Sequence, residues 1–501
     1  MAVHKIFGIE TEYGVSLRGA ADSNPVLASS MLINAYVEQR RVGWDFEDES
    51  PGQDARGFSI TGAQPPEIET HLVNTVLTNG ARYYVDHAHP EYSTPECINA
   101  YEVVVADKAG ERILARSMQA ARRLLPPEQQ IIVYKNNSDG KGNSYGTHEN
   151  YLIDRQTPFG TLVRNLIPWF ITRQIFTGAG KVGGENGSGH RGFQITQRAD
   201  FFEEEVGLET TLKRPIINTR DEPHADPARY RRLHVIVGDA NLCEVATFLK
   251  VGTTAIILGM IEAGVLTKDV SLVSPVKAIR SISHDPTLRA TLELAGDGTR
   301  MTAVELQWEF LDRAKKFADE YGLEFSGGDV VGRDVLRRWE EVLTDLETAA
   351  RTGDFSALDG KLDWVTKHRI MHGFVERDGL AWNDPKLSLI DLQYHDVRPE
   401  KSLYEKLVRS GNIERIVSED EVQRAMTNPP ENTRAYFRGS CLARWPESVI
   451  AANWDSIVLD VGSDPLRRIP MLEPTRGTKA MVEALLNRSR TPKDLVQELG
   501  A

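Results

Sequence analysis

Four short segments of the chain carry reactive side chains at every second position. The first, GIETEYG, places Glu10 and Glu12 two residues apart, directly after Gly8. On a β-strand this spacing points both carboxylates to one face, about 6.6 Å apart, while Phe7 and Ile9 point to the other. The other three segments repeat this design, with Arg82, Tyr84 and Asp86 in ARYYVDH, His148 and Asn150 in GTHENYLI, and Arg232 and His234 in RRLHVIVG.

These residue types suit a binding site better than a solvated strand face, which usually carries Lys, Thr, Ser and Glu. Two carboxylates about 4 Å apart repel by about 4 kcal/mol at an effective dielectric of about 20. If the segments are neighbours, Glu10, Glu12, Asp86 and Glu91 cannot all stay ionised without compensation. Either some of their pKa values rise or divalent cations lie among them. Carboxylates with one or two imidazoles suit Mg²⁺ or Mn²⁺, and Mg²⁺ suggests a nucleotide.

Each of these residues also has a structural interpretation when it is taken alone. Tyr84 could be a satisfied core tyrosine, His234 lies among aliphatic residues, and Asp86 could cap the end of a strand. Spacing along the chain does not say whether the four strands are neighbours. The case for a site therefore depends on all four segments meeting on one face.

Composition limits the class of protein. The chain has 501 residues, of which 41% are hydrophobic and 26% charged, as in a soluble globular protein with more than one unit. Its net charge of −13 argues against a nucleic-acid partner. The three cysteines lack C-x-x-C spacing, which argues against a zinc site and favours a reducing cytoplasm. We expect no secretory signal, because the N-terminus runs straight into a predicted strand. The apolar stretch 245–265 contains Lys250 and Glu262, so we expect a buried helix there rather than a membrane span.

The elements that position these residues predict an α+β fold. Strands and helices alternate irregularly and the strands look half-exposed, so we expect a curved antiparallel sheet packed with helices. An acidic stretch at 43–66 has no periodicity. We expect it to be a mobile insert that covers or gates another part of the protein. We also expect a helix at 67–79, turns in HPEYSTPEC, and a hairpin that pairs 131–135 with 145–153. The prolines at 429 and 430 divide a catalytic domain, 1–430, from a small C-terminal domain, 431–501.

A resemblance joins these motifs. The runs GIETEYG, YYVDHAHPEYSTPEC, GTHENYL, INTRDEPHADPARYRRLHVIVGDAN and LIDLQYHDVRPEKSLY resemble the glutamine synthetase-like carboxylate–amine ligase superfamily. Within it they resemble the enzymes that handle Pup, the prokaryotic ubiquitin-like protein, over nearly the whole chain. The resemblance implies a curved antiparallel sheet that cradles Mg-ATP, together with a small C-terminal domain.

The resemblance also implies roles for particular residues. Asp86 matches the family's catalytic aspartate. The residues expected to bind the metal are Glu10, Tyr84, Glu91, His148 and His234, with Glu12 as a further candidate. The residues expected to contact ATP are Gly8, Ile9, Glu10, Thr11, Glu12, Arg82, Ser93, Thr94, Asn150, Arg198, Arg220, Arg232 and Trp454.

The family contains two opposite activities. One member joins the C-terminal glutamate of Pup to a lysine; the other deamidates a C-terminal glutamine of Pup and cleaves Pup from lysines. The insert at 43–66 and the run LIDLQYHDVRPEKSLY look more like the hydrolase. We therefore expect a deamidase and depupylase that requires ATP and Mg²⁺, with Pup and pupylated proteins as partners and an indirect link to the bacterial proteasome. The alternatives are the Pup ligase and a protein that binds ATP or Pup without turnover.

Overall fold

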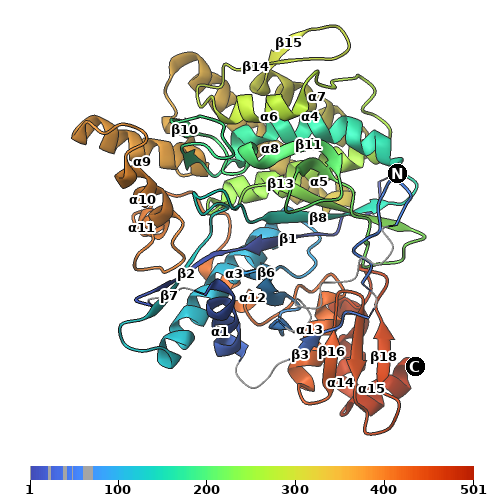
Figure 1. Ribbon diagram of the computed structural model, residues 1–501. Helices are drawn as coiled ribbons and strands as arrows, with labels where there is room; N and C mark the ends of the chain where they lie inside the picture. The colour runs from blue at the N-terminus through green and yellow to red at the C-terminus, as the bar shows by residue number, and fades with distance from the viewer. Residues whose placement is uncertain (1, 21–23, 38–41, 48, 60–71, 501) are drawn as a thin grey trace.

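The computed structural model describes residues 2–20, 24–37, 42–47, 49–59 and 72–500 (Figure 1). Its centre is a ten-stranded sheet in which sequence neighbours are often not spatial neighbours. All its pairings are antiparallel except that of the strands at 42–44 and 449–452, which run parallel. In spatial order the strands are β13 (Tyr230–Gly238), β8 (Thr147–Asp154), β1 (Phe7–Glu12), β6 (His89–Ser93), β5 (Arg82–Asp86), β4 (Asn74–Val76), β3 (Val42–Trp44), β16 (Val449–Ala452), β17 (Ser456–Leu459) and β18 (Arg467–Pro470).

Four two-stranded ribbons lie beside the main sheet. Among the described residues, three of the ribbons are antiparallel. The ribbon formed by residues 202–207 and 214–218 is parallel. The ribbons are β2 (Gly14–Arg18) with β7 (Gln130–Tyr134), β9 (Lys181–Val182) with β10 (Phe193–Gln194), β11 (Phe202–Gly207) with β12 (Arg214–Asn218), and β14 (Thr291–Glu293) with β15 (Arg300–Thr302).

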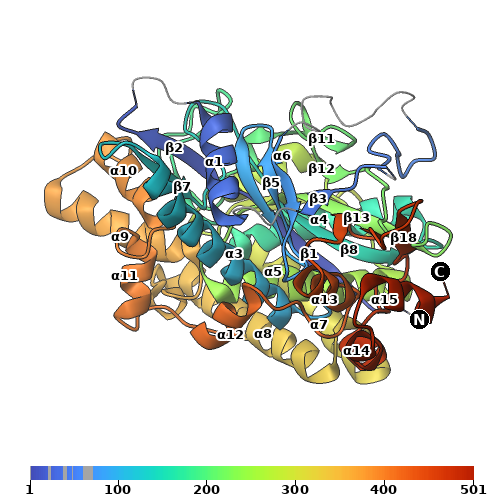
Figure 2. The same ribbon diagram turned by 90° about the horizontal axis from the view of Figure 1, so that it is seen from below.

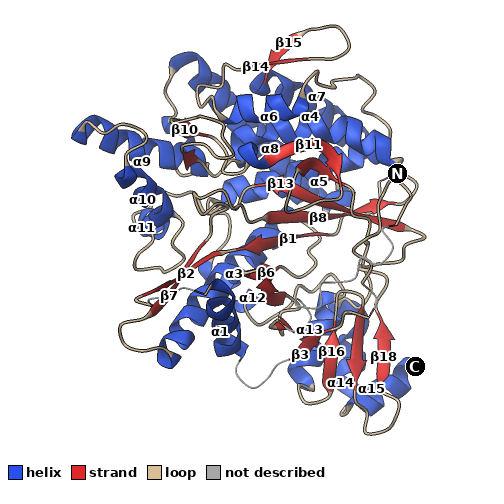
Figure 3. Cartoon of the chain, in the orientation of Figure 1, coloured by secondary structure: helices blue, strands red, loops and turns tan. Residues whose placement is uncertain are grey.

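Helices cover the sheet in separate groups, as Figure 3 shows by colour. One group packs above β8 and β13 and a second lies below β1, while a third extends at the left of Figure 1 and a fourth lies along one side of the C-terminal strands (Figures 1 and 2). They are α1 (Pro25–Val37), α3 (Ala100–Ala121), α4 (Phe159–Thr177), α5 (Glu244–Glu262), α6 (Pro275–Ser283), α7 (Ala303–Tyr321), α8 (Asp329–Thr352), α9 (Asp363–Asp378), α10 (Pro385–Tyr394), α11 (Leu403–Arg409), α12 (Glu419–Ala425), α13 (Ala435–Arg444), α14 (Lys479–Arg488) and α15 (Pro492–Leu499).

The sheet has one apolar and one polar face where it carries the reactive segments. Phe7 and Ile9 of β1 are 3% and 2% exposed and belong to the large core, while Gly8 and Glu10, which alternate with them along the strand, are half-buried on the opposite face. This is the alternation that the sequence predicts for β1. The α+β fold with a curved antiparallel sheet and packed helices is confirmed.

Helix α5 lies at the centre of the large core. By length and composition it could cross a membrane, but its apolar window is completely buried inside the molecule. A helix that is apolar on all sides is expected to be surrounded by other elements in this way. The expectation of a buried helix over 245–265 agrees with this position.

Several local predictions are wrong. Residues 74–76 form β4 where a helix was expected over 67–79, of which 67–71 lie outside the described residues. Residues 131–135 and 145–153 do form strands, but β7 pairs with β2 and β8 pairs with β1, so there is no hairpin between them. The turn-rich run HPEYSTPEC contains strand β6. Strands β7 and β8 have partners from distant parts of the chain, so local residue preference does not reveal their pairing. Strands β4 and β6 pair with the neighbouring β5, and β6 also pairs with the distant β1.

The stretch 43–66 is not structureless where the structure describes it. Its first residues belong to β3, and Asp54 forms an isolated bridge with Arg220. Further bonds join Ala55 N to Thr219 O (2.8 Å) and Asp221 N to Gln53 O (2.8 Å). Residues 60–66 lie outside the described residues. The described part of the insert therefore lies along the segment 218–222.

The C-terminal residues continue the main sheet and have a core of their own. Strands β16, β17 and β18 extend the sheet beyond β3. The small core combines Phe437, Leu442 and Ile457 with Val42 and Trp44 from the N-terminal part of the chain. The division of the chain at 430 stays a prediction, because the sheet and this core both contain residues from either side of it.

Candidate active site

The register of the sheet aligns the reactive residues in rows across six adjacent strands, from β13 to β4. Glu10 lies between His148 on β8 and Ser93 on β6, and Glu91 lies between Glu12 on β1 and Tyr84 on β5. The four predicted segments thus meet on one face, with β6 inserted between β1 and β5. In spatial order the rows are His234–Asn150–Gly8, His148–Glu10–Ser93–Arg82 and Glu12–Glu91–Tyr84–Asn74.

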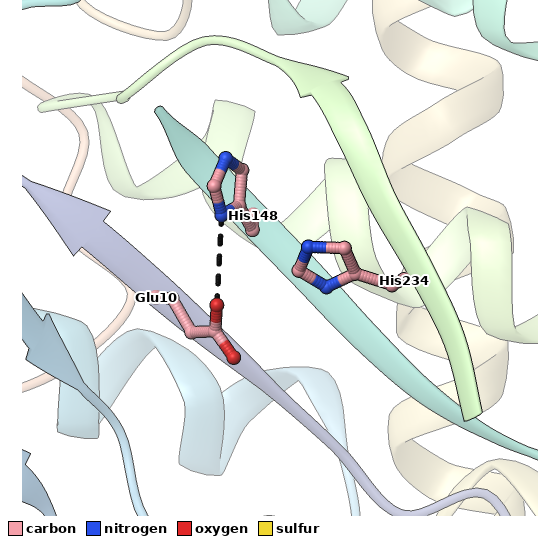
Figure 4. A group of neighbouring side chains, drawn as sticks. All are labelled: Glu10, His148 and His234. Atoms are coloured by element: carbon pink, nitrogen blue, oxygen red, sulfur yellow. Dashed lines mark ion pairs between the residues drawn. The ribbon is translucent and has the colours of Figure 1, made fainter. Parts of the chain in front are cut away.

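Glu10, His148 and His234 form a first group that could hold a cation. One ligand atom of each lies within 4.8 Å of the others (Figure 4). Nδ1 of His148 lies 3.5 Å from Glu10 Oε2, and the two imidazole centroids are 5.0 Å apart. Asn150 orients two members, since its Nδ2 donates to Glu10 Oε1 (2.8 Å) and its Oδ1 lies 2.9 Å from His234 Nδ1. When Nδ1 donates this bond, Nε2 of the neutral His234 ring keeps a free lone pair.

The ionisation states of this group suit a metal ligand set. Burial raises the pKa of Glu10, but the hydrogen bond with His148 and the charges of His234 and Arg232 outweigh it and hold the pKa well below its usual value. Burial and the neighbouring Arg232 hold the pKa of His234 well below its usual value. A carboxylate and a neutral imidazole are the forms that bind a divalent cation.

Glu12, Asp86 and Glu91 form a second such group next to the first. Burial raises the pKa of Glu91 well above its usual value, and the charges of Asp86, Glu12 and Glu10 raise it further. The hydroxyl of Tyr84 donates a hydrogen bond to Glu91 Oε1. Three carboxyl groups this close retain a proton or need a cation between them. Carboxylates, imidazoles and a phenol are the donor set that the sequence assigned to Mg²⁺ or Mn²⁺, and the residues present fit such ions.

Both groups border a polar cavity of about 400 Å³. Asp86 lines this cavity, and so do three arginines, Arg82, Arg220 and Arg232. Arg232 donates to Asn150 Oδ1 (2.7 Å), whereas Nε of Arg220 is buried without a hydrogen-bond partner. An unpartnered buried guanidinium N–H in a cavity with several cations is suited to a phosphate oxygen.

A narrow cavity of about 90 Å³ adjoins the polar cavity beyond Gly8. It lies between the ends of β1 and β6 and the loops of the C-terminal residues. A Cβ on Gly8 would stand 2.8 Å from Thr94 Oγ1, which accepts a hydrogen bond from Ile9 N at 3.0 Å, so the strand needs glycine there. Trp454 lines both cavities. Gly8, Ile9, Glu10, Ser93, Thr94, Asn150 and Arg232 line the narrow cavity as well.

Three of the residues expected to contact ATP, Thr11, Glu12 and Arg198, line neither cavity. Arg198 is 1% exposed and donates to Ser144 Oγ (3.1 Å) and to the carbonyl of Ile236. Its burial lowers its pKa to about 10. Thr11 is buried and faces away from the polar side of β1. Neither cavity is lined by Glu12, which contributes through the second carboxylate group instead. The roles assigned to all these residues stay predictions.

Sequence reasoning missed several residues that the fold brings to the site. His89 Nδ1 lies 3.5 Å from Glu12 Oε2, and Asn74 Oδ1 accepts from Arg82 Nε (3.0 Å). Glu49, Glu222 and the half-buried His224 line the polar cavity. His89 and Asn74 sit on strands that the sequence did not predict, and the other three lie on loops. The period of two, which reveals residues on predicted strands, carries no signal for them.

Comparisons with known proteins agree with one another. A family model described as Pup-ligase protein matches residues 5–458. The chain is 54% identical to a protein named depupylase from Acidothermus cellulolyticus, over 99% of each chain. It is 48% identical to a protein named Pup deamidase/depupylase from Mycobacterium tuberculosis, over 100% of this chain and 99% of the relative. A protein named Pup–protein ligase from Sanguibacter keddieii is 39% identical, over 97% of this chain and 99% of the relative.

Two solved structures are also similar. One is a complex between Pup and its ligase PafA, with a TM-score of 0.81 and 34% identity, covering 97% of this chain and 91% of that chain. The other is PafA in complex with ADP, with a TM-score of 0.76 and 36% identity, covering 90% of this chain and 97% of that chain.

Proposed function

Because this chain belongs to the Pup-ligase protein family, we propose that it is a Pup deamidase and depupylase that requires Mg-ATP. It hydrolyses the C-terminal glutamine of Pup to glutamate, and it cleaves the isopeptide bond between Pup and a substrate lysine. One observation supports this choice over the ligase. The relatives named depupylase or deamidase are 48% and 54% identical to the chain, whereas a relative named Pup–protein ligase is 39% identical at similar coverage.

The chemistry of the two reactions is the same. Water replaces ammonia or the lysine amine on the carbonyl carbon of the glutamine side chain, either directly or after Asp86 has added to this carbon, expelled the amine and formed an anhydride that water then hydrolyses. Asp86 is the residue assigned to this step, as nucleophile or as general base, because it lines the polar cavity beside Glu12 and Glu91. The arginines of the cavity stabilise the oxyanion that forms on the carbonyl oxygen.

The cofactor is assigned to the two cavities. Glu10, His148 and His234 would hold one cation, and Glu12, Glu91 and Tyr84 a second. Arg82, Arg220 and Arg232 would contact the phosphates, and Trp454 the base. When Mg-ATP is bound, its cation would supply positive charge and the nucleotide a template near the scissile amide. The chain's own contribution is to hold these groups on one rigid sheet face, with Asn150 setting the orientation of Glu10 and His234.

The test is incubation of the purified protein with Mg-ATP and Pup ending in glutamine, followed by mass spectrometry. We expect the mass gain of deamidation and, with a pupylated protein, release of the free substrate. Lysine conjugation with release of ADP, using Pup ending in glutamate, would show the ligase instead. Tight binding of Pup without any change in mass would show a non-catalytic protein.

A further inference from the structure

A buried ion cluster joins the C-terminal residues to the strand that carries Glu91. Glu96 follows β6 by three residues, and its backbone is fixed on both sides. Thr94 N donates to Ile9 O (2.9 Å), and Cys97 pairs with Phe7 through two hydrogen bonds of 2.9 and 3.0 Å. The carboxylate of Glu96 therefore has a fixed position relative to β1.

Two arginines from helix α13 and its N-terminal cap bind this carboxylate. Arg434 Nε donates to Glu96 Oε1 (2.7 Å), and Arg438 donates to both of its oxygens. The two arginines are 3% and 0% exposed. Arg438 also donates to Gly80 O (2.9 Å), in the turn before β5. We refer to Glu96, Arg434 and Arg438 as the clamp.

The clamp carries more positive than negative charge. Within the described part of the chain, Glu96 is the only carboxylate that either arginine contacts. Burial raises the pKa of Glu96, but the two arginines outweigh it and hold the pKa at about 2, so the carboxylate is ionised. One buried guanidinium charge is left without a counter-charge, which is costly unless an anion lies near it. Arg434 and Glu96 both line the narrow cavity.

The clamp also sets the position of Trp454. This residue lies between β16 and β17, where Arg438 donates to its carbonyl oxygen (3.0 Å). The guanidinium of Arg438 lies 5.2 Å from the centre of the indole ring. On its other side, Trp454 contacts Trp44 with ring centroids 5.3 Å apart. The clamp therefore connects the Trp454 segment directly to the residues that follow β6.

We propose that the clamp positions Trp454 to close the narrow cavity on the base of a nucleoside triphosphate, so that nucleotide binding and docking of the C-terminal residues depend on each other. The inference rests on the proposed function for the identity of the nucleotide. Glu96, Arg434 and Arg438 are positioning residues here, since they act through Trp454. The excess positive charge beside the cavity favours an anionic ligand over a neutral one.

The first experiment compares Arg438→Lys with the wild type by calorimetric titration of Mg-ATP. Lysine keeps the charge but cannot reach Glu96, Gly80 and Trp454 together. We expect the Kd to rise about tenfold, while the rate at saturating Mg-ATP stays within about twofold. Arg444→Met is the matched control on the same helix, because Arg444 binds Leu486 O and Asn487 Oδ1 instead. An unchanged Kd in Arg438→Lys would overturn the proposal.

A double-mutant cycle tests whether the clamp acts through Trp454. The variants are Trp454→Ala, Arg438→Lys and the two together. If the clamp works by positioning the indole, the double variant binds Mg-ATP about as weakly as Trp454→Ala alone. Effects that multiply would mean that the clamp and Trp454 act independently, and the proposal would fail.

A measurement on the wild type does not depend on the folding of any variant. We expect Mg-ATP to slow hydrogen exchange of the backbone amides at 433–438 and 452–456. Equal exchange with and without nucleotide would contradict the proposed role of the clamp.

The proposed function and the proposed role of the clamp can fail separately. A protein that processes Pup but shows no such slowing refutes the clamp alone, and one that shows the slowing but leaves Pup unchanged refutes the proposed function alone.

Discussion

At the scale of single residues, the site depends on carboxyl groups whose ionisation is set by their neighbours. Glu10 and Glu12 lie two residues apart on β1, yet Glu10 is surrounded by His148, His234 and Arg232, whereas Glu12 belongs to the group with Asp86 and Glu91. The first group is held in the ionised form that a metal needs, and the second retains a proton on Glu91 when no cation is bound. The two groups therefore differ in how they respond to metal and to pH.

Asp86→Asn tests the assignment of the reacting carboxylate. Asparagine has the same shape but is neither a good nucleophile nor a base, so we expect deamidation and depupylation to fall by at least about 10³-fold. The Kd for Mg-ATP, measured by calorimetry, should change little, because the arginines and the first metal group are intact. Asp312→Asn on the exposed face of α7 is the control. Turnover near the wild-type rate in Asp86→Asn would refute the assignment.

Metal affinity should rise with pH because of Glu91. Its pKa is raised in the folded protein, so the metal-free form carries a proton there, and a divalent cation must displace it. As the pH rises through this raised pKa, the metal-free protein loses stability, while the metal-bound protein does not. His234 stays neutral over the same range because its pKa is lowered.

Titration with Mg²⁺ from about pH 6 to about pH 8 measures this effect. We expect a lower Kd and a larger Mg²⁺-induced rise in Tm at the higher pH. Glu91→Gln should bind Mg²⁺ more weakly and with a flatter pH dependence, whereas Glu203→Gln on the exposed side of β11 should behave as the wild type. A Kd that does not vary with pH would contradict the raised pKa.

The residues that the sequence identifies are those that a period of two can reveal. Glu10, Tyr84, His148 and His234 stand out because a β-strand sorts alternate residues onto opposite faces. Glu222 and His224 sit on a loop whose path is set by its contacts with the insert and β13, so no local pattern marks them. Arg198 was assigned from a motif, and its burial beneath the site follows from packing that the motif does not describe.

At the scale of elements, glycines decide how closely strands and side chains approach. Gly146 precedes β8, and its nitrogen donates to Glu12 Oε1 (2.9 Å). A Cβ there would stand 2.2 Å from Nε2 of His148. A Cβ added to Gly43 on β3, in contrast, would have no other atom within 4 Å. The two positions are alike in residue type and opposite in the room that they leave.

Gly146→Ala should therefore remove His148 from the first metal group without unfolding the sheet. The imidazole must rotate away from the added methyl group, and we expect metal affinity to fall about 10- to 100-fold. Gly43→Ala should leave it unchanged. Titration of both variants with Mn²⁺, monitored by electron paramagnetic resonance, distinguishes them. Equal affinity in the two variants would show that His148 is not needed.

The sequence did not predict which strands pair with each other. The hairpin expected between 131–135 and 145–153 follows local turn preference, but β8 pairs instead with β1 across more than a hundred residues. Strand β6 was hidden because it contains Pro90 and follows turn-forming residues. Existence and type of the long elements were predictable, because their periodicity is local; pairing depends on contacts between distant segments.

At the scale of the whole molecule, the C-terminal residues complete the sheet that carries the site. Strand β16 pairs with β3, and the small core contains Val42, Trp44 and Val76 from the N-terminal part. Trp454 lines both cavities. The two largest hydrophobic cores of the described residues are therefore joined by one continuous main sheet.

A chain that ends at residue 430 should not fold as a stable catalytic unit. It would expose Val42, Trp44 and Val76, and β3 would lose its parallel partner. We expect aggregation on expression and no measurable binding of Mg-ATP. Co-expression with residues 431–501 as a separate chain is the control, since it restores the missing strand. A monomeric truncated chain with normal ATP affinity would show that the C-terminal residues are dispensable.

The parallel pair of β3 and β16 has a consequence for synthesis. Asn453 Nδ2 donates to Asp45 O across 408 residues of chain (3.3 Å). A ribosome that adds about 5–20 residues per second needs tens of seconds to make the stretch between them. During that time β3 in the nascent chain lacks its partner strand β16, and both cavities lack the part of their lining that Trp454 forms. We therefore expect nucleotide binding to follow the synthesis of Trp454, and a stop before this residue to yield a polypeptide that cannot enclose the nucleotide.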